Sequence, residues 1–286
     1  MEQFFNLIWS GVWLGCAYGF VGLGLIASFR SARVIDLSIG ASFVFSAMFM
    51  AWLVSVGVQI ELAVLIAVVA AIAISLLQER FILRPMVGSS PIVLLLGTLS
   101  VAIVLSGVCA AWFGRDPTTS PGLGRSLHVA LGFWRTDLNT LFLVISCLAL
   151  GILGWVWFER TITGRAVTAA GVDPGAAQML GIDIWRLRLI AMGFAGLVTG
   201  LGGALFIPIG VLDFSQGLSF TLFGFVAAAV AGYESPLRTV LVSLAFGIVS
   251  ELGTAYISSV FSQAVAFGIL AIAILIGQRF AFLRMM

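Results

Sequence analysis

Residues 160–188 read RTITGRAVTAAGVDPGAAQMLGIDIWRLR, a polar-tolerant stretch between strongly apolar segments that carries four of the fourteen arginines. Asp173 suits the N-cap of a short helix, and Pro174 suits its first position, where no N–H is needed. Gly181 suits the left-handed position just past the end of that helix. The pattern predicts a helix of about two turns from Asp173 to Gly181, too short to be stable alone in water.

One face of this predicted helix is apolar. Ala176, Met179 and Leu180 follow one another at i, i+3, i+4 spacing, so they share a face. We predict that this face docks into a groove on another protein. The alternative is an ordinary loop helix that lies on the membrane surface.

The composition indicates a membrane protein. Of the 286 residues, 61% are hydrophobic and 9% are charged, whereas about a quarter of a soluble domain is charged. Mean hydropathy is +1.18, and no polar stretch is long enough to build an aqueous domain. The sequence therefore predicts an all-α polytopic membrane protein, with residues 1–286 as one transmembrane domain and 160–188 as a segment within it.

Apolar runs predict eight or nine crossings, since a span needs about 20 residues. The expected spans are 4–29, 34–57, 60–77, 92–113, 141–158 and 189–212, and then short or interrupted segments at 218–231, 240–257 and 265–276. Short, interrupted spans are typical of helices buried among others. Residues 114–139 form the longest polar loop, which its prolines and glycines predict to be irregular.

The arginines predict the orientation. If residues 160–188 are cytoplasmic and the spans alternate, only Arg115, Arg125 and Arg135 lie outside. The other eleven lie inside: Arg30, Arg33, Arg80, Arg84, Arg160, Arg165, Arg186, Arg188, Arg238, Arg279 and Arg284. Because basic residues favour the cytoplasmic side, we expect the N-terminus outside and the C-terminus in the cytoplasm.

Several chemistries are not expected. The chain contains no lysine, and a P-loop needs a lysine to reach the nucleotide phosphates. ATP would therefore act on a partner subunit, and no catalytic residue or cofactor is expected in this chain. Cys16, Cys109 and Cys147 are isolated in apolar segments without metal-ligand spacing, so no metal site is expected.

A few polar side chains within the apolar spans are candidates for lining a transport path. They are Asp36, Ser42, Ser46, Thr98, Ser100 and Thr199. The structural alternative is helix packing for the small hydroxyl residues. For Asp36 it is a helix N-terminal position that favours an acid and a pairing with Arg33.

Glu251 is the only acid well inside an expected span. An ion- or proton-coupled secondary transporter usually keeps ionisable groups at mid-membrane, so this residue keeps that class open. The alternative for Glu251 is a hydrogen bond to a neighbouring Ser, Thr or backbone group. An intramembrane enzyme is a third class, but the acid pair, serine–base pair or metal cluster that it needs is not apparent.

Four stretches carry a resemblance to a known family. Gly164-Arg165-Ala166, Asp173, Ala176-Ala177 and Leu180-Gly181-Ile182 resemble the cytoplasmic coupling segment of permease subunits in ABC importers, and are most similar to the branched-chain amino acid permease family. Three others agree in order: RVIDL at 33–37 with Gly40, Arg84-Pro85 with Ser90-Pro91, and FVA at 225–227 with Ala231-Gly232 and Ser235-Pro236. Gly175 replaces the family's acid, Asp36 its Asn, and Ile39 its His.

The resemblance implies a type II-like ABC importer permease in the bacterial inner membrane. Its expected partners are a second permease, identical or homologous, two ATP-binding subunits that hold ATP and Mg, an extracytoplasmic substrate-binding protein and the lipid bilayer, with no nucleic acid. The residues expected to couple to the ATPase are Arg165, Asp173, Ala176, Met179, Leu180 and Gly181. The implied substrates are branched-chain or other small hydrophobic amino acids, with urea or short amides as the alternative because similar permeases carry them.

Overall fold

The computed structural model describes residues 2–123, 128–131, 134–233, 235–256 and 268. Within these residues, six helices are long and apolar enough to cross a membrane, which confirms the all-α membrane fold. They are α1 (Glu2–Ala32), α3 (Ile60–Gln78) continued by the π-helical turn η1 (Glu79–Leu83), α4 (Pro91–Trp112), α5 (Leu138–Arg160), α8 (Ile184–Phe206) and α10 (Pro236–Tyr256). Two shorter apolar helices, α2 (Ile39–Ser55) and α9 (Gly217–Val230), complete the bundle in the described part of the chain.

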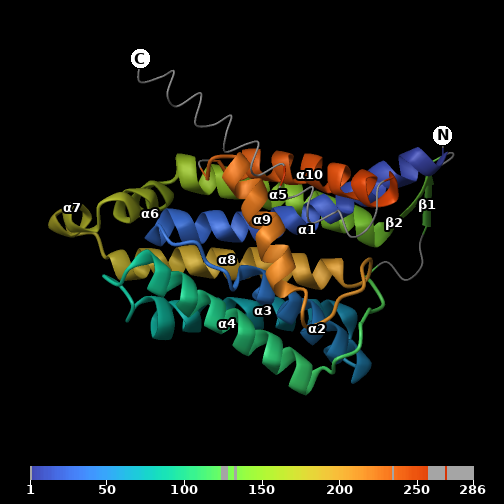
Figure 1. Cartoon of the computed structure of the whole chain (residues 1–286), viewed down its shortest axis with the longest axis horizontal. Helices are drawn as coiled ribbons and strands as arrows, with labels where there is room; N and C mark the ends of the chain where they lie inside the picture. Colours follow the sequence, from blue (N-terminus) through green and yellow to red (C-terminus); the bar gives the residue numbers. More distant parts are fainter. Residues whose placement is uncertain (1, 124–127, 132–133, 234, 257–267, 269–286) are drawn as a thin grey trace, which may run out of the picture.

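The long helices run side by side along the longest axis of the molecule (Figure 1). The helices α6 (Ile162–Val172) and α7 (Pro174–Met179) lie at one end, and the N-terminus lies at the other. The second end also holds an antiparallel hairpin, β1 (His128–Leu131) and β2 (Trp134–Asp137). We therefore refer to the α6–α7 end as the coupling end.

Helices α1 and α8 form the centre of the bundle. In the most apolar part of α1, 78% of the residues are buried, and in that of α8, 67% are buried. The corresponding share is 28% for both α3 and α4. Helix α9 runs across the long helices (Figure 1) and contacts α1 and α2. Its Phe220 meets Phe43 of α2 at 5.1 Å and Phe206 of α8 at 5.6 Å between ring centroids, so one aromatic cluster joins three helices.

Small residues allow the central helices to approach closely. A Cβ atom on Gly11 would lie 2.5 Å from the Cα of Ile248, and one on Gly15 would lie 2.7 Å from the Cα of Leu244. Gly11 and Gly15 of α1 thus lie at the interface with α10. Small residues four apart in a membrane helix favour such close helix–helix contact.

Several predicted boundaries were wrong. The second span begins at Ile39, not at residue 34, and Asp36 precedes that helix instead of lying in its first turns. Helix α8 begins at Ile184, five residues before its predicted start, and α10 begins at Pro236. The loop at 114–139 contains the β1–β2 hairpin, which composition did not predict. Apart from residue 268, the predicted span 265–276 lies outside the described residues, so the number of crossings stays a prediction.

Gly203 gives a direct test of the central packing. A Cβ there would clash with the carbonyl oxygen of Phe43 in α2. We expect Gly203→Ala to destabilise the protein by about 1–3 kcal/mol, the usual cost of overpacking a core, and to lower its melting temperature in detergent. A Cβ on Gly107 of α4 would have no atom within 4 Å, so Gly107→Ala is the control. A Gly203→Ala protein as stable as the control would mean that α2 and α8 do not pack in this way.

Candidate functional site

The predicted two-turn helix is present as α7, and its local signals have the expected geometry. The Asp173 carboxylate accepts a hydrogen bond from the Ala176 N–H at 2.9 Å, and Pro174 occupies the first position. Gly181 has a φ of +76°, a left-handed conformation that favours glycine. These capping groups confirm the predicted ends of the helix.

Helix α7 presents its apolar residues to solvent. Met179 is 91% exposed and Leu180 is 80% exposed, and Ala176 is also exposed. Ala177, in contrast, is buried and anchors the helix to the rest of the protein. An exposed methionine–leucine pair at the tip of a membrane bundle is unusual without a partner. The docking role itself stays a prediction.

Helix α6 connects this tip to the bundle. The Thr161 hydroxyl oxygen caps α6 by accepting from the Gly164 N–H at 3.1 Å. A Cβ on Gly171 would clash with the carbonyl oxygen of Arg30, so α6 lies directly on the end of α1. Arg165 is exposed, and its Nε donates to the Glu159 carbonyl at 3.1 Å. Ile162, which sequence reasoning did not single out, is 89% exposed beside these residues.

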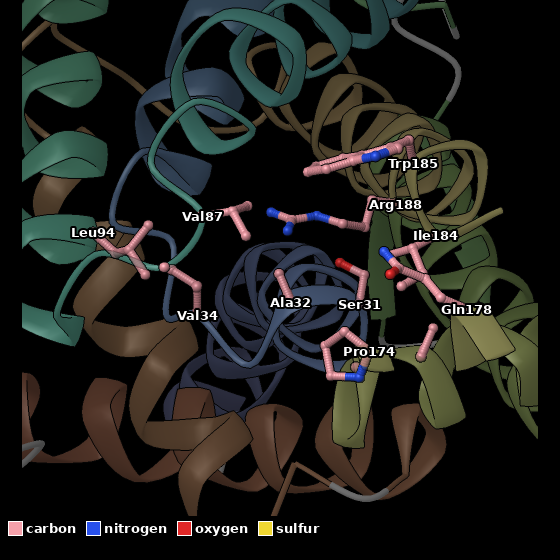
Figure 2. A pocket seen from close by; sticks show the side chains of 13 residues that line it. Ser31, Ala32, Val34, Val87, Leu94, Pro174, Gln178, Ile184, Trp185 and Arg188 are labelled. Carbon is pink, nitrogen blue, oxygen red and sulfur yellow. The ribbon is translucent and has the colours of Figure 1, made fainter. Parts of the chain in front are cut away.

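A cavity of about 160 Å³ lies between α7, the end of α1 and the start of α8. Figure 2 shows the Arg188 side chain above Ser31 and Ala32 of α1, with Gln178 to the right of them and Pro174 below. Val87, Gly88 and Leu94, from the α3–α4 connection and α4, line the far side. Helix α7 therefore lies beside a space, whereas α6 packs directly against α1.

The break between α1 and α2 contains a buried carboxylate. Asp36 is fully buried, and its Oδ1 accepts from the Ser38 N–H at 2.9 Å. The Gln78 Nε2 donates to Asp36 Oδ2 at 2.7 Å, and the Ser38 hydroxyl lies 2.6 Å from Oδ1. The predicted pairing with Arg33 was wrong, because these polar groups of α3 and the break itself satisfy the carboxylate.

Helices α4 and α9 satisfy the backbone of the same break. The Thr98 hydroxyl oxygen accepts from the Leu37 N–H at 3.2 Å. The Thr221 hydroxyl oxygen accepts from the Gly40 N–H at 3.0 Å and lies 3.1 Å from the Leu37 carbonyl oxygen. Three helices, α3, α4 and α9, thus supply polar groups to the non-helical segment between α1 and α2. A membrane protein tolerates such a segment only where protein groups replace water.

An ion pair lies next to this network. The Glu79 carboxylate and the Arg188 guanidinium approach to 2.7 Å, with side-chain exposures of 2% and 9%. Glu79 is adjacent in sequence to Gln78, and Arg188 is on the second turn of α8, at the end of the coupling segment 160–188. The ion pair and the Asp36 cluster therefore adjoin through the sequence neighbours Gln78 and Glu79 at the end of α3, one contacting the α1–α2 break and the other α8. We call the residues Asp36, Ser38, Gln78, Glu79 and Arg188 the buried polar network.

The structure separates the path candidates. Asp36, Ser42, Ser46, Thr98 and Thr199 are buried, whereas Ser100 is exposed on α4. Ser46 donates to the Gly200 carbonyl at 2.7 Å, and Thr199 donates to the Ala195 carbonyl at 2.9 Å. In this conformation these hydroxyl groups take part in helix packing or in local hydrogen bonds. Their place in a transport path stays a prediction.

Glu251 also has a structural partner. The Ser10 hydroxyl of α1 donates to Glu251 Oε1 at 3.0 Å. The alternative prediction for Glu251, a hydrogen bond to a neighbouring serine, is therefore confirmed. Because this contact accounts for the acid, Glu251 gives less support to an ion-coupled transporter.

Sequence reasoning missed Gln78, Glu79 and Arg188. Gln78 and Glu79 end a predicted span, where polar residues are ordinary, and Arg188 was counted only for orientation. The available signal was Trp185-Arg186-Leu187-Arg188, in which the second arginine falls on the same helical face as Ile184 and would have to be buried with it.

Comparisons with known proteins agree on a family. A family model described as "Branched-chain amino acid transport system / permease component" matches residues 7–277. The Escherichia coli (strain K12) high-affinity branched-chain amino acid transport system permease protein LivH is 23% identical over 96% of this chain and 93% of that protein. The Bacillus subtilis guanosine ABC transporter permease protein NupQ is 31% identical over 47% of this chain and 42% of that protein. A Lactococcus lactis nucleoside ABC transporter permease protein, NupC, is 26% identical over 54% of this chain and 57% of that protein.

Proposed function

The chain belongs to the branched-chain amino acid transport system / permease component family and is a permease subunit of an ABC importer; we propose that it forms the transport path for branched-chain or other small hydrophobic amino acids. The observation that carries this choice is the extent of the matches. The likeness to a branched-chain amino acid permease runs along nearly the whole chain, whereas the likeness to the nucleoside permeases covers about half of it.

The proposed assembly lies in the bacterial inner membrane. It contains this chain, a second permease subunit, two ATP-binding subunits that hold ATP and Mg, and an extracytoplasmic substrate-binding protein. This chain would not hydrolyse ATP, because a P-loop needs a lysine and the chain contains none.

The α7 face would receive the movement of the ATP-binding subunits. A helix in a groove transmits force through a few apolar anchors, and Met179 and Leu180 are exposed for that role. From α7 the movement has two routes into the membrane. One runs through α6, whose Gly171 lies on the end of α1, and the other runs directly into α8 after Asp183. The cavity beneath α7 leaves room for such a displacement.

The experiment for the substrate is uptake in cells that lack their own leucine and nucleoside importers. The chain is expressed with its ATP-binding subunits and binding protein, and labelled leucine is supplied. We expect uptake that unlabelled isoleucine and valine inhibit and that guanosine and urea do not. Uptake of guanosine without uptake of leucine would replace this substrate with the second candidate, a nucleoside, which the likeness to NupQ favours.

The proposed orientation places the coupling end in the cytoplasm and the N-terminus outside. Asp116 is exposed on the loop after α4, and Val172 is exposed at the end of α6. The natural cysteines, Cys16, Cys109 and Cys147, are all buried, so they contribute little background. We expect a membrane-impermeant thiol reagent to label Asp116→Cys in intact cells, and to label Val172→Cys only after the membrane is opened. Labelling of both from outside would contradict this orientation.

A further inference from the structure

An open groove of about 440 Å³ lies beside the coupling segment. Arg80 of η1, Arg84 and Pro85 of the following turn, and Trp185 of α8 line it. Trp185 also lines the cavity beneath α7 (Figure 2), so the groove is at the coupling end. Its volume falls within the range of about 300–1,000 Å³ typical of ligand sites.

The groove is basic, and one of its two arginines, Arg80, has no described acid paired with it. The Arg84 guanidinium lies over the Trp185 indole, 4.4 Å from the ring centroid. Arg80 is exposed and has no ion-pair partner among the residues that the structure describes. The nearest acid in sequence, Glu79, is buried and paired with Arg188 at 2.7 Å. Arg186, in contrast, is paired with Asp183 at 2.9 Å.

Exposed apolar surface adjoins these arginines. Leu77 and Phe81 are 54% and 69% exposed on α3 and η1, directly before and beside Arg80. Ile92 and Leu96 are 69% and 56% exposed on the first turns of α4, which follow the same connection. In a membrane helix such faces meet acyl chains. The groove therefore lies where two apolar helix faces end, with an indole at the same level, as is usual for the membrane–water interface.

We propose that this groove binds the phosphate of an anionic membrane phospholipid, with Arg80 and Arg84 as the phosphate-binding residues and the exposed faces of α3 and α4 along the acyl chains. Arginine suits this task because its planar guanidinium donates two parallel hydrogen bonds to phosphate oxygens. Basic pockets between membrane helices on the cytoplasmic side are suited to anionic headgroups. Inorganic phosphate shares the charged group but cannot use the apolar faces.

The bound lipid would also stabilise the coupling end. The Arg84 guanidinium lies over the Trp185 ring, and the Arg188 guanidinium lies 5.7 Å from the centroid of the same ring. A phosphate held by Arg80 and Arg84 would thus connect the α3–α4 corner to the first turn of α8. The site depends on the membrane and not on the identity of the transported substrate.

The experiment titrates the purified full chain, in a zwitterionic detergent, with dioctanoyl phosphatidylglycerol or dioctanoyl phosphatidylcholine, and measures bound lipid by native mass spectrometry. We expect preferential binding of phosphatidylglycerol. Each basic residue near an anionic lipid contributes roughly a factor of five in affinity, so Arg80→Gln/Arg84→Gln should weaken phosphatidylglycerol binding by roughly 25-fold. Arg80→Gln alone, which breaks no ion pair among the described residues, should show a smaller loss and guards against a folding defect.

Arg160→Gln/Arg238→Gln is the matched control, because it also removes two exposed arginines, both outside the groove and one of them lying over a tryptophan. We expect it to keep the lipid preference. Equal loss in both double variants would overturn the proposal in favour of a general charge effect. The proposal would also be overturned if the chain showed no preference for phosphatidylglycerol, or if inorganic phosphate alone bound equally well.

A third arm tests a protein occupant. If Arg80→Gln separates the ATP-binding subunits and leaves lipid binding unchanged, the groove is a protein contact and the lipid proposal is wrong. Lipid binding is measured without those subunits, so its failure is distinguishable from failure of the proposed transport function.

Discussion

Leu180→Asp is expected to leave the permease folded and inserted but to separate it from its ATP-binding subunits, abolishing uptake. Leu180 is 80% exposed in the free chain, so a charge there costs the folded chain little. In the proposed complex the same position lies in an apolar contact. An unpaired buried charge costs several kcal/mol, comparable to the loss of a strong interface anchor.

The measurement is co-purification of the ATP-binding subunits with each variant, together with uptake. Gln178→Glu is the matched control, because it adds the same charge to α7 on the side that faces the cavity (Figure 2), and we expect the subunits to remain bound. Loss of the cap in Asp173→Ala should cost only about 1 kcal/mol and weaken coupling without ending it. Wild-type co-purification and uptake by Leu180→Asp would mean that α7 is a surface helix.

Breaking the Glu79–Arg188 ion pair on one side is expected to lower the melting temperature strongly. The Glu79 side chain is 2% exposed and the Arg188 side chain 9% exposed, so removing one leaves the other as a charge that water cannot solvate. Removing one member of a buried pair typically costs about 3–5 kcal/mol, whereas replacing both with apolar residues is often neutral. For a protein of this size that loss corresponds to a shift on the order of 10 °C.

The variants are Glu79→Leu, Arg188→Met and the double replacement, measured by thermal unfolding in detergent. We expect each single replacement to be far less stable than the double one. The buried polar network also holds the α1–α2 break through Gln78 and Asp36, so the single variants should lose uptake as well. Single variants as stable as the wild type would show that the ion pair is not buried in the membrane-embedded protein.

Much of the fold was predictable because the information is local. Apolar runs located the long helices to within a few residues, and Asp173, Pro174 and Gly181 defined α7, since capping and turn preferences act over one turn. The contact face of α7 was also readable from its spacing. What the sequence does not contain is the partner that would cover it.

A break between the first two spans was predicted, but its position and non-helical form at residues 33–38 were not, because no proline or glycine lies between Ala32 and Ile39. Arg33 adopts a φ of +55° there, a conformation that non-glycine residues seldom take. The break persists because Thr98 and Thr221, on other helices, satisfy its backbone. Likewise Asp36, Gln78 and Arg188 are distant in sequence, and only the packing of α3 and α8 brings them together.

Transport by purified components decides whether this chain is the permease of an ATP-driven importer. The chain is reconstituted into liposomes with its ATP-binding subunits, the binding protein and labelled leucine outside, and ATP and Mg inside. We expect leucine to accumulate inside the liposomes only when ATP and the binding protein are present. Leu180→Asp, which disrupts the α7 contact, should abolish this accumulation. Accumulation without ATP, driven instead by a proton or sodium gradient, would contradict the account.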